Sequence, residues 1–167
     1  MQFSDIGGLD SQEIVALLDL NNQHAKETSL LDSESLNALL ASAFFARGVD
    51  RGATAFLIAL SHTACHANPN FIWFKTRRES FVYVDRVVVS QNVRGQGIAR
   101  TLYKDLFAGA KQAGFDLVVC EVNIDPPNPA SEAFHAAMGF SRVGEAAIYG
   151  GNKTVGYLEK VLSGSAD

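Results

Sequence analysis

A glycine-rich stretch, Arg-Gly-Gln-Gly-Ile-Ala-Arg at positions 94–100, is the segment of this sequence best suited to binding an anion. Gly95 and Gly97 let the backbone turn sharply and approach a ligand closely. The stretch runs into a predicted amphipathic helix, whose first N–H groups lack partners within the helix and point toward it. The arginines at its two ends add full positive charges. The pattern therefore predicts a phosphate-binding loop at the start of a helix.

Two carboxylates fall within predicted buried strands, where they are suited to acid–base chemistry. Asp85 lies in an apolar, β-branched stretch and shares a face with aromatic and valine side chains. A carboxylate in such a place either has a pKa raised by loss of hydration or has a cationic partner, such as Arg77 or Arg78. Glu121, one strand further along, is a second candidate acid–base group or substrate contact.

The apolar periodicity predicts the elements that must position these groups, in the order helix, helix, three strands, helix, strand, helix and two strands. Strands are predicted at residues 44–47, 53–60, 81–89, 117–122, 141–149 and 153–162. Helices are predicted from an N-cap at Ser11, from Asp32 or Ser33, over residues 98–113, and after Pro129 as far as Gly139. This order predicts an α/β or α+β sheet with helices on its faces.

The third predicted strand, at residues 81–89, is apolar on both alternating faces, so we expect it to be central and buried. The preceding residues 61–78 are predicted to form a loop, because Asn68-Pro69-Asn70 is typical of a segment that interrupts regular secondary structure.

The position of the glycine-rich stretch, directly after a buried strand, narrows its identity. A Walker P-loop requires Gly-Lys-Ser/Thr, and a dinucleotide fingerprint requires a third Gly or Ala where Arg100 stands. The pattern Arg/Gln-x-x-Gly-x-Gly/Ala is instead met in full by Arg94, Gly97 and Ala99.

A second motif follows at the expected distance, Asn-x-x-Ala-x-x-Leu/Phe-Tyr-x-x-x-Gly-Phe. Its positions are occupied by Asn128, Ser131, Phe134, His135, Gly139 and Phe140. Ser131 replaces the usual Ala, and His135 replaces the usual Tyr. With these two motifs the sequence resembles the GCN5-related N-acetyltransferase (GNAT) superfamily over about residues 81–162.

The resemblance implies a GNAT-like acyl-CoA N-acyltransferase fold, a mixed central sheet flanked by helices, as one domain over residues 1–167. It also implies acetyl-CoA or coenzyme A as cofactor, with the pyrophosphate on the glycine-rich loop and the pantetheine arm paired to the exposed edge of the central strand. The implied cofactor-binding residues are Val87, Val88, Val89, Arg94, Gly95, Gln96, Gly97, Ile98, Ala99, Arg100, Asn128 and Ser131.

The implied reaction is acetyl transfer to a primary amine by direct attack in a ternary complex, which needs a deprotonated amine and a protonated leaving thiolate. Asp85 stands where acidic residues often occur in the family, and is expected to be the general base, an anchor for a cationic acceptor, or a structural ion pair. His135 stands where the usual Tyr protonates the sulfur. It is either the acid or a packing residue, with a tyrosine or water as the acid.

Substrate contacts are predicted at Asn21, Asn22, Trp73 and Glu121. The acceptor is expected to be a small-molecule or peptide amine. Residues 1–74 hold 8 acidic and 3 basic side chains, a net charge of −5, which favours a cationic amine.

Composition excludes several other classes of protein. The 167 residues are 47% hydrophobic with a net charge of −4, an ordinary globular balance and a poor one for nucleic-acid binding. The apolar runs are too short to span a membrane, so a cytoplasmic protein is expected. Two cysteines are too few for a disulfide scaffold, and His62, Cys65 and His66 lack a fourth metal ligand at the usual spacing.

The sequence leaves two alternatives to catalysis open, and it also allows the chain to form a homodimer. Because the usual Tyr is absent, the chain could be a non-catalytic acyl-CoA-binding module on the same fold. The third alternative is a nucleotide-binding regulatory protein.

Overall fold

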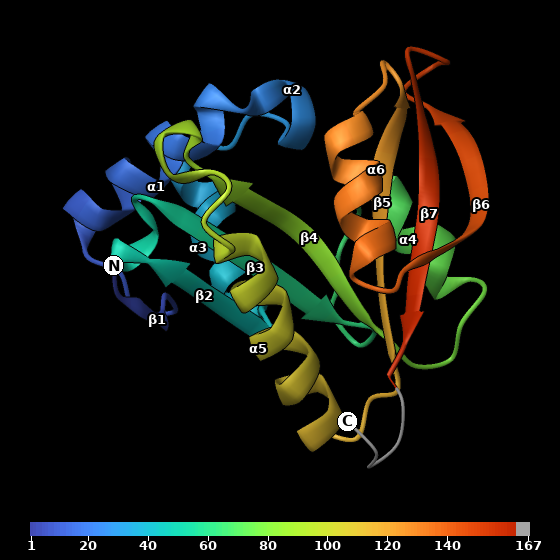
Figure 1. The fold of residues 1–167 in the computed structure, drawn as a ribbon, viewed down its shortest axis with the longest axis horizontal. Coiled ribbons are helices and arrows are strands. Elements are labelled where there is room, and N and C mark those ends of the chain that lie inside the picture. Colours follow the sequence, from blue (N-terminus) through green and yellow to red (C-terminus); the bar gives the residue numbers. More distant parts are fainter. Residues whose placement is uncertain (163–167) are drawn as a thin grey trace.

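The computed structural model describes residues 1–162 and contains one seven-stranded sheet in the order β1-β2-β3-β4-β5-β7-β6 (Figure 1). The strands are β1 (Phe3–Asp5), β2 (Phe45–Val49), β3 (Ala55–Ser61), β4 (Val82–Val89), β5 (Leu117–Asp125), β6 (Ser141–Ile148) and β7 (Lys153–Val161). All neighbouring strands are antiparallel except β4 and β5, which are parallel. The predicted mixed sheet flanked by helices is therefore confirmed.

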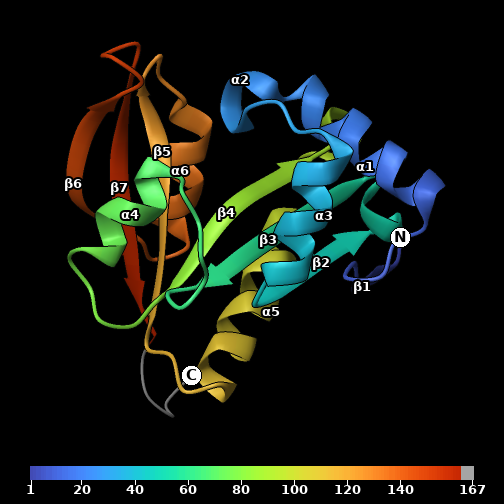
Figure 2. The same cartoon turned by 180° about the vertical axis from the view of Figure 1, so that it is seen from behind.

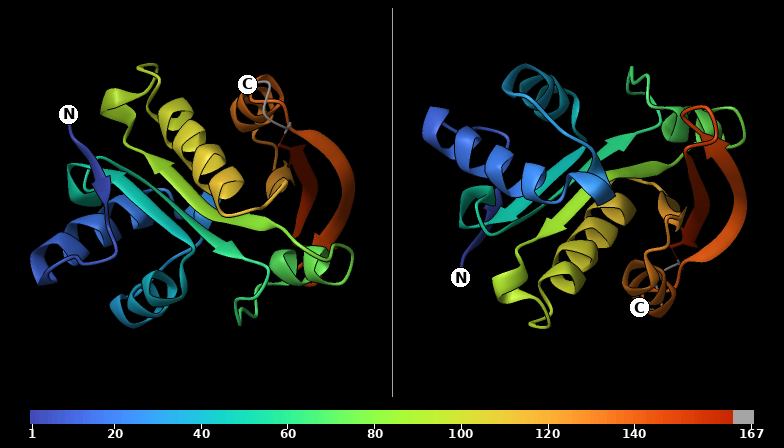
Figure 3. Two further views of the ribbon diagram at one scale, coloured as in Figure 1. Left: turned by 90° about the horizontal axis from the view of Figure 1, so that it is seen from below. Right: turned by 90° about the horizontal axis from the view of Figure 1, so that it is seen from above.

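Helices cover both faces of this sheet, as the end-on views show (Figure 3). They are α1 (Ser11–Gln23), α2 (Ala25–Thr28), α3 (Ser33–Ser42), α4 (Pro69–Lys75), α5 (Ile98–Gln112) and α6 (Pro129–Ala137), with short 3₁₀ turns at Asp50–Gly52 and Gln91–Val93. The apolar sides of α1, α3 and α4 pack on one face, and those of α5 and α6 pack on the other. Each face thus has its own hydrophobic core, and β4 contributes side chains to both.

The sheet opens between β4 and β5. Within these two strands, only Val82 with Val118 and Tyr83 with Val119 are in register. Beyond this point β4 bends away while β5 stays paired with β7, so the two strands diverge like the arms of a V (Figure 1). The rest of β4 therefore leaves its backbone groups unpaired on the side that faces β5.

A β-bulge contributes to this divergence. The register between β3 and β4 passes from Ile58–Arg86 to Ala59–Val84, which leaves Asp85 without an opposite residue. Such an extra residue bends the strand and turns its own side chain in a new direction. The bulge explains why Asp85 does not simply follow the alternation expected from the sequence.

Two predictions about the secondary structure are wrong. The N-cap of α1 is Asp10 rather than Ser11, because Asp10 and Glu13 form a reciprocal capping box. The predicted loop at residues 61–78 contains α4 (Figure 2). Asn68, expected to interrupt regular secondary structure, instead caps this helix by accepting a hydrogen bond from the Asn70 N–H at 2.7 Å.

The N-terminal strand β1 and the short helix α2 were not predicted. Among residues 1–162, no helix combines the length and apolar character that a membrane span requires.

Candidate active site

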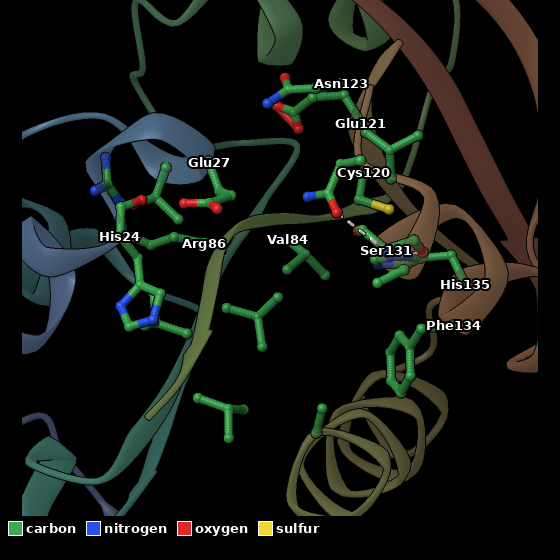
Figure 4. Close-up of a pocket in the computed structure, with 18 of the residues that line it drawn as sticks. His24, Glu27, Val84, Arg86, Cys120, Glu121, Asn123, Ser131, Phe134 and His135 are labelled. Carbon is green, nitrogen blue, oxygen red and sulfur yellow. Dashed lines mark hydrogen bonds between the residues drawn. The ribbon is translucent and has the colours of Figure 1, made fainter. Parts of the chain in front are cut away.

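A cavity of about 800 Å³ occupies the opening between β4 and β5 (Figure 4). Residues 84–89 of β4 form one wall, and residues 120–123 of β5 form the facing wall. One end is closed by the glycine-rich loop and the start of α5, and α6 lines the side next to β5. The other end lies between α2 and the turn that joins β6 to β7.

The glycine-rich loop has the backbone needed for an anion site. Gly95 and Gly97 have φ values of 81° and 78°, a left-handed conformation that side chains other than glycine rarely adopt. A Cβ placed on either glycine would meet no atom within 4 Å, so this backbone is open to the cavity. Gly97 is the N-cap of α5 and supplies no side-chain cap, so the first N–H groups of the helix remain available to a ligand.

The predicted cofactor residues are brought together, with one exception. The cavity is lined by Val87, Val88, Val89, Arg94, Gly95, Gly97, Ile98, Ala99, Arg100, Asn128 and Ser131. Gln96 is exposed and is not among the lining residues. Asn128 also caps α6, since its side chain accepts a hydrogen bond from the Ser131 N–H at 3.3 Å.

His135 lies on α6 against the cavity and forms a buried pair with Tyr103 of α5. Its Nδ1 is 2.8 Å from the Ser131 carbonyl oxygen, which can only accept, so this nitrogen carries the ring proton. The Nε2 atom must then accept the hydrogen bond from the Tyr103 hydroxyl, at 2.7 Å. Burial lowers the pKa of His135, although the bond to the Ser131 carbonyl opposes this shift. The imidazole is therefore neutral, and its single proton is held by the Ser131 backbone.

Asp85 lines the cavity, but its carboxylate is already paired. One oxygen lies 2.9 Å from His66 Nε2 and the other accepts from Arg86 Nε at 3.1 Å, with only 2% of the side chain exposed. The prediction that Arg77 or Arg78 pairs with Asp85 is wrong. Arg78 pairs with Glu159, and the bulge directs Asp85 toward His66 and Arg86. Burial raises the pKa of Asp85, but the hydrogen bond from His66 and the charge of Arg86 outweigh it, so the pKa is lowered.

Arg86 continues this ion pair toward α1 and α2. Its Nη1 donates to the Asn21 side-chain oxygen at 2.9 Å, and the Asn21 amide donates to the Ser29 carbonyl at 3.0 Å. Asn22 holds the same loop through two hydrogen bonds with the Leu31 backbone. Neither Asn21 nor Asn22, both predicted as substrate contacts, is among the residues that line the cavity; both brace the segment that forms its wall.

Trp73, the third predicted substrate contact, is also absent from the cavity lining. Its ring stacks on Tyr157 with the centroids 4.1 Å apart and 16° between the planes. The Arg77 guanidinium covers the ring at 4.2 Å. A Cβ on Gly144 would lie 2.5 Å from Trp73, so this strand residue leaves space for the indole. Trp73 is a packing residue between α4 and the β6–β7 hairpin.

Glu121 alone of the predicted substrate contacts lies in the cavity, on the wall opposite Glu27 and Arg86 (Figure 4). It accepts a hydrogen bond from the Tyr83 hydroxyl. Burial raises the pKa of Glu121 to about 7, with a further rise from the charge of Asp85, against the lowering effect of the Tyr83 hydrogen bond. A carboxyl group with this pKa exchanges protons at neutral pH.

Several site residues were missed in the sequence. Arg86, His66 and Asn70 act through contacts across 19 to 87 positions of the chain, and no local pattern marks them. Tyr103 carries no motif of its own and is one of four tyrosines in the sequence, any of which could be the alternative acid. Within residues 1–162 no group of three or more His, Cys, Asp or Glu side chains is arranged to hold a metal ion.

Comparison with known proteins places this geometry in a family. The family model described as "Acetyltransferase (GNAT) family" matches residues 36–140. No curated protein sequence matches the chain.

Solved structures share the fold at low sequence identity. The chain is similar to Naa20 of Chaetomium thermophilum in complex with a bisubstrate analogue, with a TM-score of 0.75, 16% identity, and coverage of 97% of this chain and 87% of that chain. An aminoglycoside 6'-N-acetyltransferase complexed with coenzyme A gives a TM-score of 0.73 at 13% identity, with 100% of both chains covered. A ribosomal-protein-alanine N-acetyltransferase from Brucella melitensis gives 0.67 at 21% identity, covering 97% of this chain and 100% of that chain.

Proposed function

Since this chain belongs to the GNAT family of acetyltransferases, we propose that it transfers the acetyl group of acetyl-CoA to a primary amine by direct attack in a ternary complex. The observation that carries the proposal is that one cavity contains an open strand edge, an anion-binding helix start and a buried carboxyl group with a pKa of about 7. We propose that residues 1–167 act as one such domain.

The residues present fit coenzyme A. The N–H groups at the start of α5, with Arg94 and Arg100, suit its pyrophosphate, and the left-handed glycines allow close backbone approach. The unpaired edge of β4 at Val87–Val89 suits the amides of the pantetheine arm, as in strand addition. When bound, acetyl-CoA supplies an acetyl group activated as a thioester.

We propose Glu121 as the general base in place of Asp85. An amine arrives as an ammonium ion and must lose a proton before its lone pair can attack the carbonyl carbon. Glu121 is about half ionised near neutral pH and lies on the cavity wall. Asp85 has a lowered pKa and both of its oxygens are engaged, so it is a poor proton acceptor by comparison.

Attack breaks the carbon–sulfur bond, and the departing thiolate takes up a proton. His135 as the acid requires an imidazolium, because the proton of the neutral ring is held by the Ser131 carbonyl. Its lowered pKa makes the imidazolium scarce at neutral pH. We therefore propose that water protonates the sulfur and that His135 acts mainly by packing, with His135 as the acid the competing proposal.

The acceptor is proposed to be a small-molecule or peptide amine that enters between α2 and the β6–β7 turn. Glu27 and Glu121 face each other across this end of the cavity, which favours an acceptor that carries positive charge (Figure 4).

Two experiments test the function. Calorimetry with coenzyme A, ATP and NAD should show binding of coenzyme A alone, and equal or tighter binding of ATP or NAD would support the regulatory alternative. Turnover of acetyl-CoA should then be measured against a panel of small amines and peptides. Coenzyme A binding with no turnover on any amine would support the non-catalytic alternative.

A further inference from the structure

The segment that closes the acceptor end of the cavity has a strained backbone. Ser29, the C-cap of α2, has a φ of 77° and a ψ of 155°, a region that only glycine adopts readily. Glu27, Thr28 and Ser29 line the cavity at the end where the acceptor is proposed to enter. A strained conformation persists only where surrounding contacts hold it. The contacts that hold Ser29 therefore determine the shape of this wall.

Two side chains hold the Ser29 carbonyl oxygen. Asn21 Nδ2 donates to it at 3.0 Å, and Arg86 Nη1 donates to it at 3.4 Å. Arg86 Nη1 also donates to Asn21 Oδ1, at 2.9 Å. A guanidinium only donates and a carbonyl only accepts, so the two ends of the Asn21 amide can be assigned in one way alone. Asn21 thus joins Arg86 to the Ser29 backbone.

The two holding side chains are themselves fixed. Asn21 lies on α1 and is fully buried, with 0% of its surface exposed. The Arg86 side chain is 10% exposed, and its Nε donates to Asp85 at 3.1 Å. The other Asp85 oxygen lies 2.9 Å from His66 Nε2. A buried network in which each of these polar groups has a partner is rigid, so it can oppose the strain at Ser29.

We propose that Asn21 is a positioning residue for acceptor binding: with Arg86 it holds Ser29 in its strained conformation and so keeps α2 in place as a wall of the acceptor site. The inference rests on the proposed entry of the acceptor at this end of the cavity. It gives Asn21, which the sequence predicted as a direct substrate contact, a role through the backbone instead. Without Asn21, relief of strain favours other conformations of the segment. The apparent affinity for the acceptor then falls with the fraction of molecules that keep the wall.

The first test is Asn21→Leu, which keeps the size of the side chain and removes both of its hydrogen-bonding ends. The KM for the amine should rise about fivefold, the scale of one lost hydrogen bond, while kcat and coenzyme A affinity change by less than about twofold. Asn37→Leu, at an exposed position on α3, is the matched control and should leave all three values in place. An unchanged KM for the amine, or a fall in kcat alone, overturns the proposal.

Asn21→Asp serves where Asn21→Leu does not fold. The aspartate keeps an oxygen for Arg86 and removes only the donor to the Ser29 carbonyl, so the KM for the amine should rise in the same way.

Ser29→Gly provides a rescue, because glycine adopts this backbone without strain. Alone it should raise Tm by about 2–4 °C, whereas Ser35→Gly, the same change within helix α3, should lower Tm. Added to Asn21→Leu, Ser29→Gly should lower the KM for the amine by about twofold or more, and Ser35→Gly should not. Failure of this rescue would show that Asn21 does not act through the Ser29 backbone, and it overturns the proposal.

Hydrogen exchange needs no substrate and separates this inference from the proposed function. The Ser29 and Leu31 amides donate to the Ala25 carbonyl and the Asn22 side chain. Both should exchange about fivefold faster in Asn21→Leu, while the amides of α5 stay protected. Unchanged exchange overturns the hold on Ser29, even where the chain proves to be an acetyltransferase. Faster exchange in a protein that acetylates no amine supports the hold and removes the proposed function instead.

Discussion

Asp85 and Glu121 line the same cavity, but their surroundings move their pKa values in opposite directions. Asp85 receives a hydrogen bond from His66 and a guanidinium from Arg86, and this favours its charge. Glu121 is buried, which disfavours its charge, and it faces the negative charge of Asp85, while the Tyr83 hydroxyl that donates to it is neutral. The sequence shows both residues as carboxylates in apolar strands and does not distinguish them, since their partners come from distant segments.

Removing the proposed proton acceptor, Glu121, should slow acetyl transfer without weakening coenzyme A binding. In Glu121→Gln we expect kcat to fall roughly 100-fold or more, the usual scale for a general base, with the acidic limb of the pH profile lost. Coenzyme A affinity by calorimetry should be unchanged.

The companion variant Asp85→Asn should behave differently. It leaves Arg86 without its buried counter-charge, so the free energy of unfolding should fall by about 3 kcal/mol while the acidic limb persists. Loss of the limb in Asp85→Asn, with the limb retained in Glu121→Gln, would restore Asp85 as the base.

His135→Phe tests the competing acid. Phenylalanine fills the aromatic cluster with Phe134 and Phe140 but leaves the buried Tyr103 hydroxyl without its acceptor. We expect unfolding free energy to fall by about 1–3 kcal/mol, measured in urea, with the basic limb of the pH–rate profile unchanged. Disappearance of that limb would identify His135 as the proton donor.

Local sequence patterns predicted the helices and strands that form the proposed cofactor site. The helix near the proposed acceptor site was not predicted, because its role depends on long-range contacts. The glycine-rich loop, α5 and β4 follow from the sequence, because left-handed glycines, a helix start and a buried strand all have local signals. By contrast, α4 was not predicted, since Asn68-Pro69 is typical both of a loop and of the capped start of a helix. Trp73 of this helix was predicted as a substrate contact, but in the structure it stacks on Tyr157 of β7.

Gly97→Val should abolish coenzyme A binding. Valine is strained at a φ of 78° and places two methyl groups where the backbone faces the cavity. Calorimetry should detect no binding while circular dichroism stays unchanged. In the same assay Arg94→Ala and Arg100→Ala should each weaken binding by about 1–2 kcal/mol, as partly exposed charged contacts do.

For the whole molecule, Glu121 makes stability depend on pH. Its pKa is raised from 4.5 to about 7 on folding, so the native state binds more protons than the unfolded chain between these values. The stabilisation is therefore complete below pH 4.5 and is lost as pH rises through about 7.

Glu121→Gln should remove this dependence. We expect the variant to be more stable than the unchanged protein at pH 8, by about 3 kcal/mol, and equal to it near pH 4.5. Urea unfolding at the two pH values measures the difference. Equal stability at pH 8 would mean that Glu121 titrates normally in the folded protein.

The unpaired edge of β4 also bears on self-association. An open strand edge is a template on which another chain can add a strand, and proteins usually blunt or cover it to avoid aggregation. Here the edge lies inside a concave site, between α2 on one side and α6 on the other, so a neighbouring molecule has no straight approach to it. The contact of Arg86 with Asn21 braces the segment that shields the edge. The segments that enclose the cavity thus also shield an unpaired strand edge from other chains.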